Sequence, residues 1–358
     1  MNNAYDRQLK ELLMLAFKKE ASDLHFSVNH PPILRIGGKL VLVKVGDNKK
    51  LNSDDTKGFA TSLMTESQMQ RLMEEKDVDF SYKLEDVARF RVNIFFQSGS
   101  ISCALRQIPA RIRTIEELNL PPILHKFTEA PQGFVLITGP SSQGKSTTMA
   151  ALIEEINHQR TDHIITIEDP IEYVFSDDRA IIDQREVYQD ATSFPTALRA
   201  TFRQDPNVIM VGEMRDAETI GTAISAAETG HLVFATLHTN DAAQTIHRVV
   251  DSFPGEQQNQ IRAQLSSSLL GIISQRLIRR VSGGLIPACE VLIANAAVSN
   301  LIRENKVHEI PLVIETSTDT GMISLNRSLT FLVKKGEISE KDALNYSLHP
   351  EELKMLLK

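Results

Sequence analysis

The residues best suited to chemistry lie between positions 139 and 148. Gly139, Gly144, Lys145 and Ser146 follow the spacing G-x-x-x-x-G-K-[ST] of a phosphate-binding loop, between an apolar run at 134–137 and a helical pattern. Glycines let successive backbone N–H groups turn toward one point, and the following helix adds N–H donors and a partial positive charge. A chance Gly/Ser-rich turn would lack this strand-and-helix context. The stretch therefore predicts a nucleotide site, with Lys145 on the outer phosphates and the Ser146 hydroxyl on Mg²⁺.

Polar side chains follow three further apolar, β-branched-rich runs. Glu168 follows 164–167, Glu213 comes shortly after 208–211, and His238 comes shortly after 232–235. Continuous apolar runs are typical of parallel strands that are covered on both faces. Because ligands of such sheets bind at the carboxyl ends of the strands, we expect these three side chains near the phosphate loop.

Two carboxylates and an imidazole beside a phosphate loop are suited to metal-assisted hydrolysis. One carboxylate holds Mg²⁺ through water, and the other orients or deprotonates the attacking water. An imidazole donor can contact the γ-phosphate oxygens. Taken alone, an acid after a strand is often an N-cap, and a lone histidine is more often structural. Together, and after a phosphate loop, Glu168, Glu213 and His238 favour the functional interpretation.

Arginines are the other conspicuous group. Arg89, Arg91 and Arg106 lie on expected strands of the N-terminal region, and Arg111 and Arg113 lie in a Pro- and Arg-containing stretch. Arginines on strands usually form a solvated face, but in oligomeric ATPases an arginine can stabilise charge on the γ-phosphate of a neighbouring subunit. The net charge of −7 and the absence of interleaved aromatic residues argue against nucleic-acid binding.

The 358 residues predict a small α+β domain followed by an α/β core. Expected elements of the first region are a helix at 5–19, a hairpin around Gly37-Gly38, a helix at 53–76 and strands at 79–82, 88–96 and 100–108. The core has expected helices at 193–204 and 216–229, and from Asp241 the chain reads as mostly helical, at 241–250, 256–279, 295–304, 323–335 and 339–357.

Composition limits the class of protein. Two distant cysteines, Cys103 and Cys289, form neither a disulfide framework nor a four-cysteine zinc site. The charged N-terminal stretch does not resemble a signal peptide, and no uncharged apolar run approaches the roughly 20 residues of a membrane helix. We therefore expect a soluble protein that reaches a membrane only through a partner.

Long blocks of the sequence resemble the secretion-type hexameric ATPases, and within them the type IV pilus retraction ATPases of the PilT type. The blocks are ASDLHFSV (21–28), ARFRVN (88–93), GPSSQGKSTT (139–148), IITIEDPIEYVF (164–175), RQDPNVIMVGEMRDAET (203–219) and TGHLVFATLHTNDA (229–242). The resemblance implies an α/β fold: a PAS-like N-terminal domain (1–108), a linker (109–122) and a RecA-like P-loop ATPase domain with C-terminal helices (123–358).

The resemblance also implies roles for single residues. The expected nucleotide contacts are Gly139, Pro140, Ser141, Ser142, Gln143, Gly144, Lys145, Ser146 and Thr147, which form Walker A, with ATP and Mg²⁺ as cofactors. Glu168 matches the catalytic base, Glu213 the Walker B acid and His238 the His-box histidine, while Ser146 and Glu213 hold Mg²⁺, partly through water. Arg91 and Arg106 match arginines that approach nucleotide across domain or subunit contacts.

Two departures from the family pattern stand out. Ser142 and Gln143 replace the usual glycine and serine of GPTGSGKS, which can alter the flexibility of the loop but keeps its spacing. The stretch AVSNLIRE (297–304) resembles the AIRNLIRE helix, but Val298 and Ser299 replace isoleucine and arginine, so a charge associated with retraction is missing.

The implied function is a cytoplasmic homohexameric motor at the inner face of the inner membrane. Its ATP hydrolysis would act on the inner-membrane pilus platform protein and depolymerise the pilus, as in twitching motility, with a paralogous pilus ATPase as a further partner. The alternatives are an accessory retraction paralogue or an extension or type II secretion ATPase. The latter usually carries an added N-terminal domain and a tetracysteine metal site, which two cysteines and this length disfavour.

Overall fold

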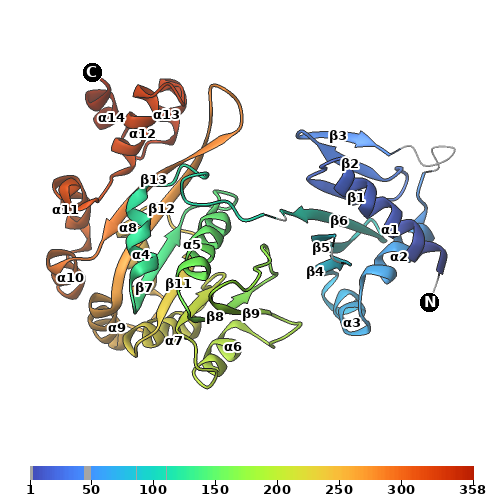
Figure 1. Cartoon of the computed structure of the whole chain (residues 1–358), viewed down its shortest axis with the longest axis horizontal. Coiled ribbons are helices and arrows are strands. Elements are labelled where there is room, and N and C mark those ends of the chain that lie inside the picture. Colours follow the sequence, from blue (N-terminus) through green and yellow to red (C-terminus); the bar gives the residue numbers. More distant parts are fainter. Residues whose placement is uncertain (1–2, 44–49, 86, 110) are drawn as a thin grey trace. The chain divides into compact units, whose positions relative to one another are not determined.

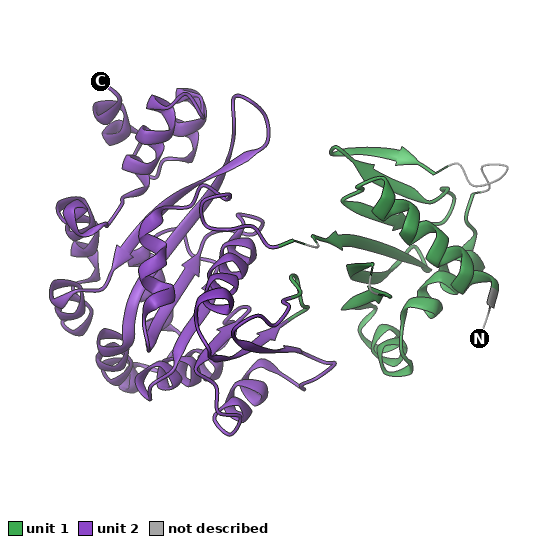
Figure 2. Ribbon diagram, viewed as in Figure 1, with its two compact units in different colours: residues 1–111, 169–174 green, residues 112–168, 175–358 purple. Residues whose placement is uncertain are grey.

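The computed structural model describes residues 3–43, 50–85, 87–109 and 111–358. Parts of two expectations, residues 1–2, 44–49 and 86 of the N-terminal domain and Ala110 of the linker, lie outside the described residues. The chain divides into two compact units (Figure 2), unit 1 with residues 1–111 and 169–174, and unit 2 with residues 112–168 and 175–358.

In its described residues, unit 1 is an antiparallel sheet with three helices (Figure 1). The helices are α1 (Asn3–Lys18), α2 (Ser53–Leu63) and α3 (Glu66–Glu75), and the strands are β1 (Asp23–Phe26), β2 (Ile33–Ile36), β3 (Lys39–Leu42), β4 (Asp77–Leu84), β5 (Ala88–Gln97) and β6 (Ser100–Ile108). The order across the sheet is β3-β2-β1-β6-β5-β4, and each neighbouring pair is antiparallel. Its core includes the stacked rings of Phe26 and Phe59.

The helix expected at 53–76 is two helices. Met64 is extended, and Thr65 caps α3: its hydroxyl accepts from the backbone N–H of Gln68, whose side chain accepts from the backbone N–H of Thr65. This reciprocal capping box satisfies N–H groups at a new helix start and therefore separates the two helices.

Unit 2 is a seven-stranded sheet covered by helices (Figure 1). Its order is β13-β12-β7-β11-β10-β8-β9, parallel throughout except for the antiparallel β12–β13 pair. The strands are β7 (Gly133–Thr138), β8 (His163–Glu168), β9 (Ile181–Glu186), β10 (Val208–Val211), β11 (Leu232–Leu237), β12 (Leu269–Arg279) and β13 (Leu285–Ile293). The helices before β13 are α4 (His125–Glu129), α5 (Lys145–Gln159), α6 (Phe194–Thr201), α7 (Ala217–Glu228), α8 (Ala242–Asp251) and α9 (Gly255–Ser268), with a 3₁₀ turn, η1, at Pro122–Leu124.

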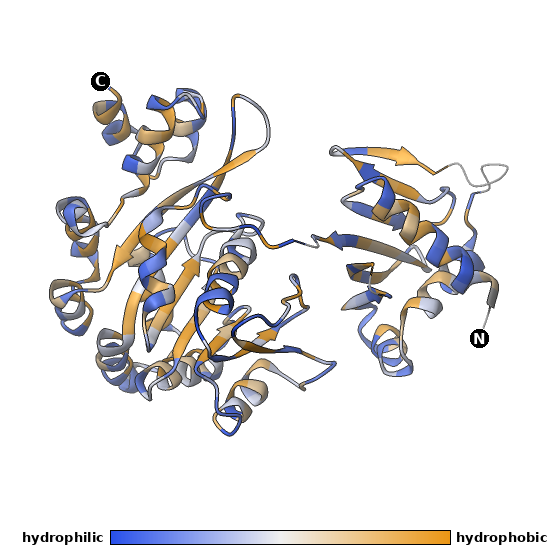
Figure 3. Ribbon diagram, viewed as in Figure 1, coloured by the Kyte–Doolittle hydropathy of each residue, from blue (hydrophilic) through white to orange (hydrophobic). Residues whose placement is uncertain are grey.

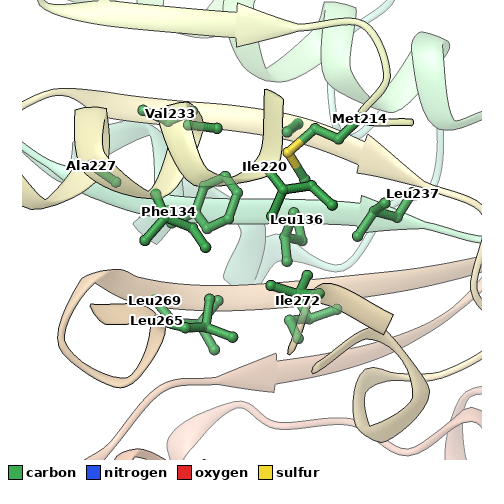
Figure 4. Packing of buried hydrophobic residues seen from close by; sticks show 14 of the residues in the cluster. Phe134, Leu136, Met214, Ile220, Ala227, Val233, Leu237, Leu265, Leu269 and Ile272 are labelled. Atoms are coloured by element: carbon green, nitrogen blue, oxygen red, sulfur yellow. The ribbon is translucent and has the colours of Figure 1, made fainter. Parts of the chain in front are cut away.

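The four apolar runs form the parallel centre of this sheet, as predicted. Every residue of β7, β10 and β11 is buried, so side chains on both faces are covered, and these strands stand out as apolar in Figure 3. On one face, Phe134 and Leu136 of β7 lie among side chains from α7 and α9, including Ile220 and Leu265 (Figure 4). Burying each of these large side chains contributes about 1.5–3 kcal/mol and holds the strand ends in register.

The helix expected at 256–279 is wrong beyond Ser268. The segment from Leu269 to Arg279 is strand β12, which pairs in parallel with β7 and antiparallel with β13. Its apolar residues, at 269–270, 272–273 and 277–278, do not by themselves separate a buried strand from a buried helix, and pairing in the sheet decides the outcome here. Gly271 lets the ring of Phe127, from α4, pack closely against β12, because a Cβ at this position would lie 2.4 Å from that ring.

The C-terminal part is helical, as predicted. The helices are α10 (Ala296–Arg303), α11 (Ile310–Thr316), α12 (Leu325–Lys334), α13 (Glu340–Tyr346) and α14 (Pro350–Leu357), with 3₁₀ turns at Val307–Glu309 and Thr318–Thr320. The helix expected at 339–357 is divided into α13 and α14, and Pro350 begins the second one. In the part of the chain that the structure describes, no helix is both long and apolar enough to cross a membrane.

Candidate nucleotide site

The phosphate loop connects β7 to α5 and is shaped by backbone conformations that glycine adopts readily. Gly139 has φ +145° and Gly144 has φ +82°, and a Cβ on Gly139 would lie 2.5 Å from the backbone oxygen of Gln275. Ser142 has φ +61°, a left-handed conformation, at the position where the family pattern GPTGSGKS has its second glycine. Because the N-cap Gly144 has no side chain, the first N–H groups of α5 are not capped by it and can bind an anion.

Lys145 begins α5 and points back into its own loop. Its ammonium donates to the backbone oxygens of Gly139 at 2.8 Å and Pro140 at 2.9 Å, and lies 3.3 Å from Nδ1 of His238. The residue is only 8% exposed. An ammonium held among carbonyl oxygens beside uncapped helix N–H groups provides a strong positive centre for phosphate oxygens.

The ends of β10 and β11 bring Glu213 and His238 to the same place. The two strands pair in parallel, with Val211 opposite Ala235, so the residues that follow them emerge at one edge of the sheet. Nε2 of His238 lies 3.4 Å from a carboxylate oxygen of Glu213, and Arg215 also donates to Glu213. Lys145, His238 and Glu213 thus form a connected polar chain, as the positions of the strand ends predicted.

The surroundings of His238 favour its neutral imidazole form. Burial lowers its pKa, and the neighbouring charges of Lys145 and Arg215 lower it further. Because the Lys145 ammonium can only donate, Nδ1 of His238 accepts and Nε2 carries the proton that faces Glu213. His238 therefore presents one N–H donor at the site.

Glu168 ends β8 and is held by two donors. The Thr166 hydroxyl donates to one of its carboxylate oxygens at 2.7 Å and the Gln184 amide, from β9, donates to the same oxygen at 3.0 Å. Glu168 is 5% exposed. Two donors on one carboxylate oxygen fix the orientation of the other oxygen, which is the arrangement that a positioned base requires.

Arg91 and Arg106 lie in unit 1, directly opposite one another on β5 and β6. Arg91 donates to Glu172 at 2.9 Å and Arg106 donates to Asp23 at 3.0 Å. Burial alone would raise the pKa of Asp23, but the hydrogen bonds from Arg106 and Ser22 outweigh it, so this pKa is lowered. Both guanidinium groups are thus ion-paired within unit 1. Their assignment to the reaction stays a prediction.

A pocket of about 500 Å³ adjoins the loop within unit 2. Its wall includes Gly144 and Thr147 at the start of α5, Leu277 and Arg280 at the end of β12, and Asn119. This volume is in the range of small-molecule sites. The sequence pattern gave no signal for it, because 256–279 reads as a helix, and it gave none for the carboxylate partners Thr166 and Gln184.

Two further polar side chains, also not found from the sequence, contact the segment that follows His238. From β12, Arg276 donates to the side-chain and backbone oxygens of Asn240, and from β13 Glu290 accepts the backbone N–H of Ala242 at the start of α8. Desolvation, with a smaller contribution from the nearby charge of Asp241, raises the pKa of Glu290 to about 7. The segment after His238 is thus fixed by groups on two neighbouring strands.

Glu290→Gln should stabilise the protein in alkaline but not in acid solution. A glutamate whose pKa is raised on folding contributes its full stability below the ordinary pKa and loses it as pH rises toward about 7. Glutamine retains the acceptor for Ala242 without the charge, so the variant should match the wild type near pH 4.5 and exceed it by about 1–3 kcal/mol near pH 8. Urea unfolding at both values measures this. Glu256→Gln, in the exposed first turn of α9, controls for the lost charge, and an equal offset at both pH values would contradict the assignment.

Comparison with known proteins places this site in a family. The family model described as "Type II/IV secretion system protein" matches residues 2–319. The type IV pilus retraction ATPase PilT of Pseudomonas aeruginosa is 43% identical over 96% of this chain and 99% of its own length, and the type IV pilus ATPase PilU of the same organism is 37% identical over 98% and 91%.

A solved structure titled as the pilus retraction motor PilT with bound ADP superimposes with a TM-score of 0.89 at 46% identity, covering 97% of this chain and 98% of that one. The likeness extends over nearly the whole chain. The chain belongs to the type II/IV secretion system protein family, and within it is similar to the type IV pilus retraction ATPases.

Proposed function

We propose that this chain is an ATP-hydrolysing motor of type IV pilus retraction. The observation that supports this best is the meeting of Lys145, at the start of α5, with Glu213 and His238, which follow the ends of β10 and β11. Glu168 is held at the end of β8 in the same sheet. A nucleotide-binding module without hydrolysis would not need a carboxylate fixed by two donors. The likeness to the ADP-bound retraction motor supports the same nucleotide.

The site fits a magnesium–nucleotide complex. The uncapped start of α5 and Lys145 suit the phosphates, and the 500 Å³ pocket suits the nucleoside. Ser146 and Glu213 supply the hard oxygen ligands that Mg²⁺ prefers. When bound, Mg²⁺ neutralises phosphate charge and so favours attack by water.

The protein residues divide the remaining tasks. Glu168 orients the attacking water and takes its proton, because Thr166 and Gln184 hold one of its carboxylate oxygens and so fix the direction of the other. The Nε2–H group of His238 donates a hydrogen bond to Glu213 and, with nucleotide bound, to the γ-phosphate. Lys145 exchanges its two loop carbonyls for phosphate oxygens.

A ring of six copies is part of this proposal. Arg91 and Arg106 supply positive charge to a nucleotide from outside unit 2, so that hydrolysis is coupled to movement of unit 1. The motor works at the cytoplasmic face of the inner membrane, on the pilus platform protein.

An accessory retraction ATPase is the second candidate, favoured by helix α10. Val298 of this helix is fully buried and preserves packing, whereas Ser299, which is not buried, replaces an arginine of the family pattern and removes a charge. The similarity to PilU over nearly the whole chain is consistent with that role.

Deleting the gene in its source organism tests the proposal. Cells that carry more pili and lose twitching motility would support a main retraction motor, because extension would continue unopposed. Cells without pili would indicate an extension ATPase, and cells with normal pilus number but weaker retraction would indicate the accessory role. Complementation with the wild-type gene controls for the deletion itself.

A further inference from the structure

Two glutamines connect the phosphate loop to β12 in opposite directions. The side-chain oxygen of Gln143, in the loop, accepts the backbone N–H of Leu277 at 2.7 Å. The side-chain amide of Gln275, on β12, donates to the backbone oxygen of Gln143, also at 2.7 Å. The side chain of Gln143 therefore contacts β12, and not the side of the loop on which phosphate would bind.

Gln275 also holds the helix that follows the loop. Its side-chain oxygen accepts the Thr148 hydroxyl at 2.7 Å, and the residue is 2% exposed. One residue earlier on β12, the Ser274 hydroxyl lies 2.8 Å from the hydroxyl of Thr138, the last residue of β7. The start, the middle and the end of the loop are thus each fixed to the same strand.

The contact with Gln275 determines which way the loop presents its donors. A trans peptide points its C=O and its N–H in opposite directions, so the bond to the Gln143 oxygen turns the N–H of Gly144 away from β12. The space is also filled, because a Cβ on Gly144 would lie 2.8 Å from the side-chain nitrogen of Gln275. The contacts with β12 therefore favour this orientation of the loop without any contribution from nucleotide.

We propose that Gln143 and Gln275 form an amide clamp that preorganises the phosphate loop, and that both act as positioning residues for nucleotide binding. The inference rests on the proposed function, since it assigns the clamp to that nucleotide site. Preorganisation lowers the free-energy cost of ordering the loop when a ligand binds. Without the clamp, nucleotide has to order the loop itself, so affinity falls while the bound state stays the same.

Gln143→Met and Gln275→Met in the full chain test the clamp, because methionine keeps the length of the side chain without its amide. Each lost hydrogen bond should weaken ATP binding about 5- to 30-fold, with KM raised and kcat unchanged. Hydrogen exchange of the amides at 139–148 should accelerate in the nucleotide-free variants and return to the wild-type rate with saturating ADP. Gln143→Glu retains the acceptor for Leu277 and should restore slow exchange without nucleotide.

Gln159→Met, at the far end of α5, is the matched control and should leave loop exchange unchanged. Wild-type exchange of the loop in both nucleotide-free methionine variants would overturn the clamp, as would equal acceleration across all of β12 and α5. If Gln275→Met does not fold, Gln143→Met still decides, since Gln143 is only partly buried. Failure of the wild type to hydrolyse ATP would contradict the proposed function instead, because exchange without nucleotide measures the clamp independently.

Discussion

Glu168→Gln is expected to lower kcat about 10²- to 10⁴-fold, the contribution of a positioned general base, and to leave ATP binding nearly unchanged. Glutamine has the same shape and keeps an oxygen for the Thr166 hydroxyl and the Gln184 amide, so the geometry at the end of β8 is retained. Only the capacity to take a proton from water is lost. Steady-state turnover and the affinity for a non-hydrolysable ATP analogue measure the two quantities separately.

Glu213→Gln distinguishes the two carboxylates. If Glu213 holds Mg²⁺, its loss should raise the Mg²⁺ concentration needed for half-maximal turnover, whereas Glu168→Gln should leave that concentration unchanged. Glu154→Gln, on α5, removes a carboxylate that contacts Asn157 and His158, and serves as the control for charge. Normal turnover in Glu168→Gln would remove the assignment of the base.

The parts of the site that sequence could predict are those defined by local pattern. The phosphate loop is a contiguous motif, and Glu168, Glu213 and His238 each follow an apolar run whose length and β-branched content indicate a buried strand. Parallel pairing then places the residues after Val211 and Ile167 at one edge, because both belong to neighbouring strands in register. To predict these residues of the site, it was enough to expect that the strands form a parallel sheet.

The parts that could not be predicted depend on contacts far apart in the chain. Gln275 bonds to Gln143 across 132 residues, and its segment reads as a continuation of α9 until the pairing of β12 with β7 is known. The contact between Gln184 and Glu168 could not be predicted either, because strand β9 was not expected and Gln184 belongs to no motif. The roles proposed for Arg91 and Arg106 involve a neighbouring subunit, and within this chain the two arginines pair with Glu172 and Asp23.

Lys145→Ala should weaken binding of ATP by about 10²- to 10⁴-fold. A hydrogen bond to a charged group contributes about 1.5–3 kcal/mol, and the ammonium is expected to make two, which amounts to about 3–6 kcal/mol of binding free energy. Isothermal titration with ATP and with AMP measures the effect, which should be much smaller for AMP because Lys145 is placed for the outer phosphates. Lys334→Ala, an exposed lysine on α12, is the control.

The same variant must be tested for folding, because Lys145 already has a structural task. Its ammonium donates to the backbone oxygens of Gly139 and Pro140, and removing it takes this donor from one buried and one partly buried acceptor. The unfolding temperature without nucleotide should therefore fall slightly. The rise in unfolding temperature that ATP gives to the wild type should vanish in the variant, since that rise depends on binding alone. A variant that keeps wild-type stabilisation by ATP would show that the nucleotide binds elsewhere, because every other contact at this loop depends on a phosphate held beside Lys145.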